Sequence, residues 1–200
     1  MAGIILAGGS GKRMGGVKKS HQLLAGKTLL DWVVERLVPL FDELVLVTDC
    51  PWLYPSFPGL VVSDIHPGQG PLGGIETGLL ATSDRVSFVC ACDMPFLSKD
   101  LICHMESHAL SYDIVIPRIG RFIEPLHAFY SKRTLDVIRT HLEQGNYKVG
   151  SLFIAPLSVY YINEDITRKF DPSLLSFFNI NTWTDLELAH ILLEARLDVK

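Results

Sequence analysis

A short apolar run joined directly to a glycine-rich, cationic loop begins the chain. The run at residues 4–6, Ile-Ile-Leu, predicts a strand that is buried on both faces of a sheet. Five glycines follow within residues 8–16. The loop also carries four cations: Lys12, Arg13, Lys18 and Lys19. Glycine lets successive N–H groups turn toward an anion, and the cations add fixed positive charge. We therefore expect a polyphosphate-binding loop rather than a solvated surface turn.

Single positions exclude three better-known phosphate loops. A Walker loop ending at Gly26-Lys27-Thr28 would need glycine at position 21, which is His21. A dinucleotide fingerprint that starts at Gly9 would need glycine where Met14 stands, and a protein-kinase loop fails at the same position. The pattern that remains, L-A-G-G-x-G-x-R-M-G followed by a lysine, resembles the signature of nucleotidyltransferases.

Apolar runs and helical periodicities alternate along the rest of the chain. They predict strands at 44–47, 60–62, 86–92, 114–117 and 126–130, and extended segments at 159–162 and 177–180. They predict helices at 28–38, 76–82, 99–110, 134–142 and 185–194, with a second glycine loop at 67–75 leading into the second of these. This alternation indicates an α/β fold, with a largely parallel sheet covered by helices on both faces. We expect one domain over residues 1–200.

Composition excludes several classes of function. A net charge of −4 argues against general binding to nucleic acid or to a membrane surface. No apolar run reaches the roughly 18 residues of a membrane span, and the N-terminus does not resemble a signal peptide. The four cysteines show no zinc-site spacing. We expect reduced thiols and a cytoplasmic location.

Two aspartates follow predicted strands and are candidate metal or nucleotide ligands. Asp64 and Asp93 would lie at the same edge of a parallel sheet as the first glycine loop. Mg²⁺ prefers a few carboxylates together with phosphates and water, and it would withdraw charge from the phosphorus under attack. Each aspartate could instead cap a turn or a helix, an alternative that is stronger for Asp64 than for Asp93.

A polar segment near the C-terminus, F-F-N-I-N-T-W-T-D-L, gives a second candidate group. Asn179 and Asn181 lie two residues apart, so in an extended segment they face the same way, and one or both could reach a metal or a phosphate. Thr182 or Thr184 could cap the helix that follows, which is a sufficient structural role for part of this motif.

Taken together, these pieces resemble the molybdenum cofactor guanylyltransferase family over nearly the whole chain. The matching motifs are L-A-G-G-S-G-K-R-M-G-G followed by Lys19, A-G-K-T-L-L, S-D with Gly70-Pro71-Leu72-Gly73-Gly74, Cys92-Asp93-Met94-Pro95-Phe96, E-P-L-H-A-F-Y at 124–130 and N-I-N-T at 179–182. The resemblance implies a three-layer, Rossmann-like nucleotidyltransferase sandwich with a mixed, mostly parallel sheet. It also implies transfer of GMP from GTP to the terminal phosphate of molybdopterin carrying molybdenum, with Mg²⁺ and release of pyrophosphate.

The resemblance also implies roles for individual residues. The nucleotide site would include Leu6, Ala7, Gly8, Gly9, Gly11, Lys19, Asp64 and Asp93. Arg13 and Lys19 would bind the triphosphate, Asp64 would contact the guanosine, and Asp93 and Asn181 would hold Mg²⁺. Arg13, Lys19 and Asp93 are the expected catalytic residues. Partners would be GTP, molybdenum-molybdopterin, and cofactor-delivery or acceptor molybdoenzymes.

Two departures from the family pattern leave alternatives open. The residue before the motif lysine is commonly acidic in the family but is Lys18 here, which we expect to be solvated. An asparagine commonly follows the second strand, where this chain has Val47-Thr48-Asp49, so the motif leaves the choice of base open. Cytidylyl transfer to the same cofactor, a sugar-1-phosphate nucleotidyltransferase and a non-catalytic nucleotide-binding module remain alternatives.

Overall fold

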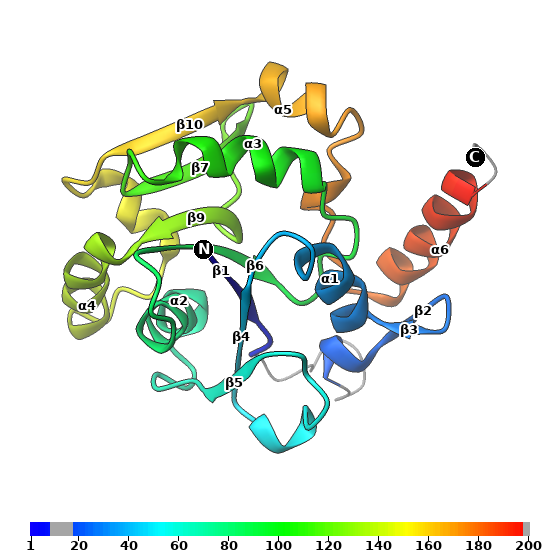
Figure 1. Ribbon diagram of the computed structural model, residues 1–200, viewed down its shortest axis with the longest axis horizontal. Helices are drawn as coiled ribbons and strands as arrows, with labels where there is room; N and C mark the ends of the chain where they lie inside the picture. Colours follow the sequence, from blue (N-terminus) through cyan, green and yellow to red (C-terminus); the bar gives the residue numbers. More distant parts are fainter. Residues whose placement is uncertain (9–17, 198–200) are drawn as a thin grey trace.

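A mixed eight-stranded sheet forms the centre of the molecule (Figure 1). The structure, a computed structural model, describes residues 1–8 and 18–197. The strand order is β10-β7-β9-β6-β1-β4-β5, with β8 paired to β7, and β2 and β3 form a separate hairpin. The strands are β1 (Ala2–Leu6), β2 (Leu23–Leu24), β3 (Lys27–Thr28), β4 (Glu43–Thr48), β5 (Leu60–Ser63), β6 (Val86–Ala91), β7 (Ile114–Ile119), β8 (Phe122–Ile123), β9 (His127–Ser131) and β10 (Val159–Asn163).

The half of the sheet that contains β1 is parallel. β1 pairs in parallel with β4 on one side and with β6 on the other, and β5 continues in parallel from β4. The direction reverses at β9, which runs antiparallel to both β6 and β7, and β8 also runs antiparallel to β7. The expected mixed, mostly parallel α/β sheet is confirmed.

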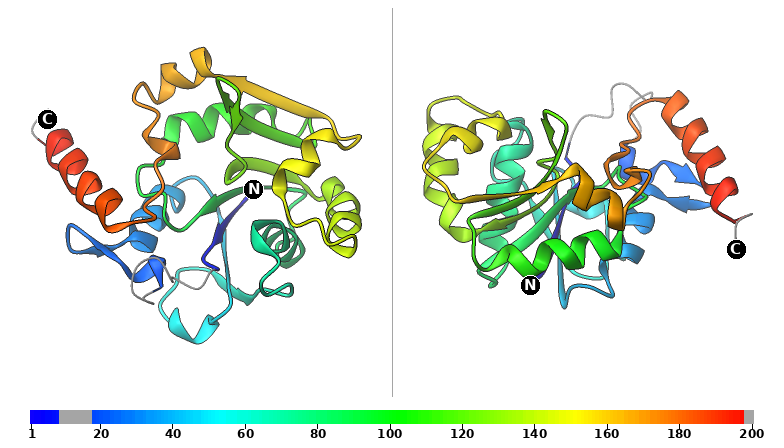
Figure 2. Two further views of the ribbon diagram at one scale, coloured as in Figure 1. Left: turned by 180° about the vertical axis from the view of Figure 1, so that it is seen from behind. Right: turned by 90° about the horizontal axis from the view of Figure 1, so that it is seen from above.

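Helices cover both faces of the sheet, as expected from the alternating pattern. They are α1 (Leu29–Leu37), α2 (Gly70–Ala81), α3 (Lys99–Ala109), α4 (Leu135–Glu143), α5 (Glu164–Phe170) and α6 (Trp183–Leu197). Neighbouring residues of one strand face opposite cores: Ile5 packs with α1 and α3, whereas Ile4 packs with α2 and α4. α6 lies beside the β2–β3 hairpin and shares a smaller core with it (Figure 2). Within the described ranges no helix combines the length and apolarity that a bilayer crossing requires.

The helix start at α2 differs from the expected one. Residues 70–75, expected to be loop, are already helical, and the helix begins at Gly70 with Pro71 in its first turn. The glycines are there for packing, because a Cβ at Gly78 would lie 2.4 Å from Ile4 Cγ2 and one at Gly74 would lie 3.3 Å from Leu6 Cδ2. Glycine thus lets α2 lie close against β1, and this contact outweighs its low helix propensity.

The segment at 177–180 also differs from the expectation. It joins no sheet: the 3₁₀ turn Leu175–Phe177 is followed by irregular backbone up to α6. A backbone bond from Ile180 N–H to the Asp93 carbonyl, 3.0 Å long, and the buried Ile180 side chain anchor this segment. That bond brings the two asparagines of the polar segment to the carboxyl end of β6.

Candidate active site

The carboxyl ends of four parallel strands meet at one edge of the sheet. β1 ends at Leu6, β4 at Thr48, β5 at Ser63 and β6 at Ala91. Backbone bonds align these ends: Ala7 N–H donates to the Val47 carbonyl at 2.8 Å, and Cys92 N–H donates to the Leu6 carbonyl at 3.1 Å. Ligands of such sheets bind at this edge, and the residues that follow the four strands therefore form a candidate site.

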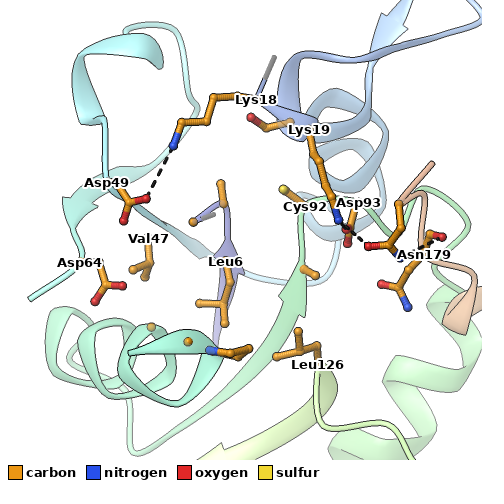
Figure 3. Close-up of a pocket in the computed structure, with 18 of the residues that line it drawn as sticks. Leu6, Lys18, Lys19, Val47, Asp49, Asp64, Cys92, Asp93, Leu126 and Asn179 are labelled. Atoms are coloured by element: carbon orange, nitrogen blue, oxygen red, sulfur yellow. Dashed lines mark hydrogen bonds and ion pairs between the residues drawn. The ribbon is translucent and has the colours of Figure 1, made fainter. Parts of the chain in front are cut away.

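A cavity of about 930 Å³ opens at this edge (Figure 3). Most of the residues expected from the sequence line it: Leu6, Ala7, Gly8, Lys19, Asp64, Asp93, Asn179 and Asn181. Three further expected residues, Gly9, Gly11 and Arg13, lie outside the described residues. The cavity size is within the roughly 300–1,000 Å³ of small-molecule sites.

Lys19, Asp93 and Asn181 line the cavity and form one polar cluster, of which Figure 3 labels Lys19 and Asp93. The Lys19 ammonium donates to Asp93 Oδ2 at 2.9 Å and to Asn181 Oδ1 at 2.5 Å. The second carboxylate oxygen, Asp93 Oδ1, is buried and has no hydrogen-bond partner among the described residues. A buried carboxylate oxygen without a partner costs free energy, so this atom is suited to a cationic ligand.

Asn181 is held in place by the start of α6. Asp185 Oδ2 accepts hydrogen bonds from Asn181 N–H at 2.9 Å and from Thr182 N–H at 2.8 Å, and Asp185 N–H donates to Thr182 Oγ1 at 3.2 Å. The N–H of Asn181 is the largest cause that lowers the pKa of Asp185. The capping role considered for Thr182 is therefore correct, and the same cap orients Asn181 toward the lysine.

Lys18 is not solvated as expected. Its side chain is 21% exposed, lines the cavity and forms an ion pair with Asp49 at 3.6 Å. The side chains of Lys18 and Lys19 diverge at the start of the 3₁₀ turn Lys19–His21. The Lys18 ammonium lies near the end of β4, and the Lys19 ammonium lies near the end of β6 (Figure 3). The two adjacent lysines thus line opposite sides of one cavity.

Asp64 both lines the cavity and organises the loop that follows β5. Its Oδ1 accepts hydrogen bonds from His66 N–H at 2.9 Å and from Thr77 Oγ1 at 3.1 Å. The loop is fixed again by Glu76, whose side chain is 3% exposed, lies 2.7 Å from His66 Nε2 and accepts a bond from Arg139 Nε at 2.8 Å. The turn-forming role considered for Asp64 therefore coexists with its place in the cavity.

Sequence reasoning missed several residues of the cavity wall. Cys92 lines it immediately before Asp93, and burial raises the pKa of its thiol, so the group is neutral at pH 7. Its position at the end of an apolar strand was a usable signal. Leu126 reaches the cavity from the turn before β9, and Pro71 reaches it from the first turn of α2. Both residues lie in motifs of the family resemblance, but the motifs do not show that these side chains face the cavity, because the pairing of distant strands brings them here.

Comparisons with known proteins give one consistent family. The family model described as the MobA-like NTP transferase domain matches residues 3–155. A molybdenum cofactor guanylyltransferase from Desulfosudis oleivorans is 37% identical over 98% of this chain and 96% of its own length. A probable molybdenum cofactor guanylyltransferase from Peptoclostridium acidaminophilum is 40% identical over 92% of this chain and 85% of its own length.

A solved structure is similar over the same extent. Molybdopterin-guanine dinucleotide biosynthesis protein A from Archaeoglobus fulgidus superposes with a TM-score of 0.85 at 32% identity, covering 98% of this chain and 100% of that one. The family match, the two relatives and the shared fold agree with the resemblance that the motifs indicate. The chain belongs to the MobA-like NTP transferase family.

Proposed function

We propose that this chain transfers GMP from GTP to the terminal phosphate of molybdenum-molybdopterin and releases pyrophosphate. The observation that carries this proposal is the similarity, over more than nine tenths of the chain, to proteins named molybdenum cofactor guanylyltransferase. The cavity supports it, because cationic and carboxylate side chains converge there at the edge of the sheet where nucleotides bind.

In the proposed reaction, an oxygen of the acceptor phosphate attacks the α-phosphorus of GTP. A new P–O bond forms as the bond between the α- and β-phosphates breaks, and pyrophosphate leaves with the electron pair. The acceptor oxygen is already an anion, so the step requires no general base. The protein aligns the two phosphates and neutralises charge, with Lys19 and Arg13 as the proposed cationic groups.

Asp93 and Asn181 are the proposed Mg²⁺ ligands. Their side chains fit a hard divalent cation, because both supply oxygens and Asp93 Oδ1 is buried without a partner among the described residues. Such an ion, when bound, offsets the charge that develops on the phosphate oxygens. Lys19 already contacts both oxygen ligands and is therefore close enough to redirect its ammonium to a bound triphosphate. We place the reaction in the cytoplasm, where the four cysteines of the protein would remain thiols.

The direct test is a radiolabel transfer assay with purified protein, Mg²⁺ and molybdenum-loaded molybdopterin. We expect label from α-³²P-GTP to appear in the acceptor in step with pyrophosphate release. Label that stays in GTP, with no pyrophosphate formed above the rate without acceptor, would contradict the proposed function and favour a nucleotide-binding module.

A further inference from the structure

A second cavity lies next to the catalytic one. It is a shallow depression that is largely open to solvent, with a volume of about 350 Å³. Two chain segments form walls of both cavities: Leu126 lines the catalytic cavity and Glu124 the second, while Asn179 lines the catalytic cavity and Phe178 the second. Residues one or two positions apart have Cα atoms no more than roughly 7 Å apart. The second cavity, which we call the side pocket, therefore adjoins the part of the catalytic cavity that Leu126 and Asn179 line.

The wall of the side pocket is mostly apolar and aromatic. Phe122, Phe177 and Phe178 contribute three rings, and Leu174 and Leu175 contribute aliphatic surface. Phe122 lies at the outer edge, where its side chain is 62% exposed. Aromatic rings of this kind favour a flat ring system that can stack on them.

The inner wall is rigidly built. The buried carboxylate of Asp171 accepts hydrogen bonds from Leu175 N–H at 3.2 Å and from Ser176 N–H at 2.7 Å. These bonds fix a turn in which Leu174 has a φ of 54°, a left-handed conformation that is unfavourable for a leucine. Backbone strain of this kind is common where a structure presents side chains to a ligand. The Phe177 ring is braced edge-on by a buried histidine ring, 5.2 Å away between centroids.

One carboxylate faces this apolar surface. Among the described lining residues, Glu124 is the only titratable one. Its carboxylate forms no hydrogen bond or ion pair within residues 1–8 and 18–197, and burial raises its pKa. A ligand that covered this half-buried carboxylate would have to supply N–H donors in place of the water that it displaces. The side pocket is therefore suited to a flat heteroaromatic ring with N–H donors along one edge.

We propose that the side pocket binds the pterin ring of the acceptor, with the 2-amino group and N3–H of the ring donating to Glu124. These two adjacent donors match the two oxygens of a carboxylate, and the ring face matches the wall formed by Phe122 and Phe178. The inference rests on the proposed function, which requires a pterin bound close to the catalytic cavity. It assigns recognition of the acceptor to residues that do not line the catalytic cavity.

A binding experiment that needs no turnover tests the pocket by itself. Fluorescence titration of the full chain with free pterin is compared with titration with lumazine, in which an oxo group replaces the 2-amino group. We expect wild-type protein to bind pterin about tenfold or more tightly than lumazine, because the oxo group would face the carboxylate. Glu124→Gln should reduce this preference to within about threefold. Glu143→Gln, which changes an exposed carboxylate at the end of α4, should leave it unchanged.

Steady-state kinetics provide the second readout. Glu124→Gln and Phe122→Ala should each raise the KM for molybdenum-molybdopterin about tenfold or more while the KM for GTP stays within twofold. Because Phe122 is largely exposed, its replacement is compatible with folding, which thermal unfolding checks. Equal binding of pterin and lumazine to wild-type protein, or an unchanged acceptor KM in both variants, would overturn the pocket assignment. Selective pterin binding without any GMP transfer would instead support the pocket and contradict the proposed function.

Discussion

Lys19 Nζ lies 2.9 Å from Asp93 Oδ2, although 74 positions separate the two residues in the chain. The ion pair connects the segment after the glycine loop to the carboxyl end of β6. It also leaves Asp93 Oδ1 as the oxygen without a partner among the described residues. A bound triphosphate would compete with Asp93 for the lysine, so the pair links the proposed metal ligand to the proposed phosphate ligand.

Replacing the proposed metal ligand tests this relationship. Asp93→Asn keeps the shape of the side chain but removes the charge that would balance a divalent ion. We expect a normally folded protein whose kcat falls a hundredfold or more, equivalent to several kcal/mol of transition-state stabilisation. Initial rates measured across a Mg²⁺ titration check this, with thermal unfolding as the control for folding. Near-normal turnover at saturating Mg²⁺ would show that Asp93 is not a ligand on which catalysis depends.

The two adjacent lysines are expected to differ in kinetic effect. Lys19→Ala should lower kcat more than it weakens GTP binding, because Lys19 is placed to act on charge that develops during transfer. Lys18→Ala should mainly raise the KM for GTP, since Lys18 lies across the cavity, paired with Asp49. The comparison needs kcat and KM for both variants under the same conditions. Equal losses of kcat at the two positions would contradict separate roles.

Much of this arrangement follows from local sequence. The apolar run at 86–92 predicts the buried strand that the structure has at Val86–Ala91, and the apolar spacing within 28–38 predicts the helix found at Leu29–Leu37. The directions of the Lys18 and Lys19 side chains do not follow from the local sequence. They depend on the placement of β4 and β6 on either side of β1. Local propensity also fails at Gly74, where close packing on Leu6 makes glycine a helical residue.

The side pocket shows a further limit of sequence reasoning. Glu124 and Phe178 are far apart in the chain, and neither belongs to a periodic element that would reveal its neighbours. The E-P-L-H motif indicates that the segment matters without saying what it contacts. Antiparallel pairing of β9 with β6 and β7 creates the juxtaposition, and such long-range pairing is not encoded in any short window of residues.

The buried carboxylate of Glu76, on α2, should contribute to the stability of the protein and to the shape of the site. Glu76→Gln keeps the volume but weakens the contacts with His66 and Arg139. We expect a loss of about 1–3 kcal/mol in the free energy of unfolding, or a fall in Tm of roughly 3–10 °C. Glu143→Gln, at an exposed position, should change the free energy by less than about 0.5 kcal/mol. Equal Tm values for the two variants would contradict a stabilising role for these contacts.

A buried histidine should make the fold sensitive to acid. Burial lowers the pKa of His127 to about 3, whereas an unfolded histidine has a pKa of about 6.5. The unfolded state therefore takes up a proton that the folded state does not, and stability is lost as the pH falls below about 6.5. Lowering the pH from 7 to 5 should therefore reduce the free energy of unfolding by about 2 kcal/mol through this histidine.

His127→Leu should remove that part of the pH dependence, measured by urea unfolding at several pH values. At pH 8, where both states are neutral at this position, the two proteins should differ only by a constant packing offset. A wild-type pH slope retained in the variant would contradict the assignment.

Carboxylates near the nucleotide should favour guanine over cytosine. Guanine presents N1–H and an N2 amine as donors, whereas cytosine presents the acceptors N3 and O2. Asp49 and Asp64 both line the cavity and are the candidate acceptors for the guanine edge. Asp64→Asn keeps an oxygen for Thr77 and His66 while removing the charge, so it separates base recognition from loop structure. We expect Asp49→Ala or Asp64→Asn to lower the ratio of kcat/KM for GTP to kcat/KM for CTP. The expected loss corresponds to roughly 1–3 kcal/mol of discrimination between the two bases. An unchanged ratio in both variants would assign base recognition to other groups.

The most direct measurement is turnover of each α-³²P-labelled nucleoside triphosphate by wild-type protein with molybdenum-loaded molybdopterin and Mg²⁺. We predict acceptor-dependent pyrophosphate release, with kcat/KM for GTP at least about tenfold above that for CTP, because each mismatched polar group in the site costs roughly 1–3 kcal/mol. Use of CTP as well as or better than GTP would contradict guanylyl transfer and replace it with cytidylyl transfer.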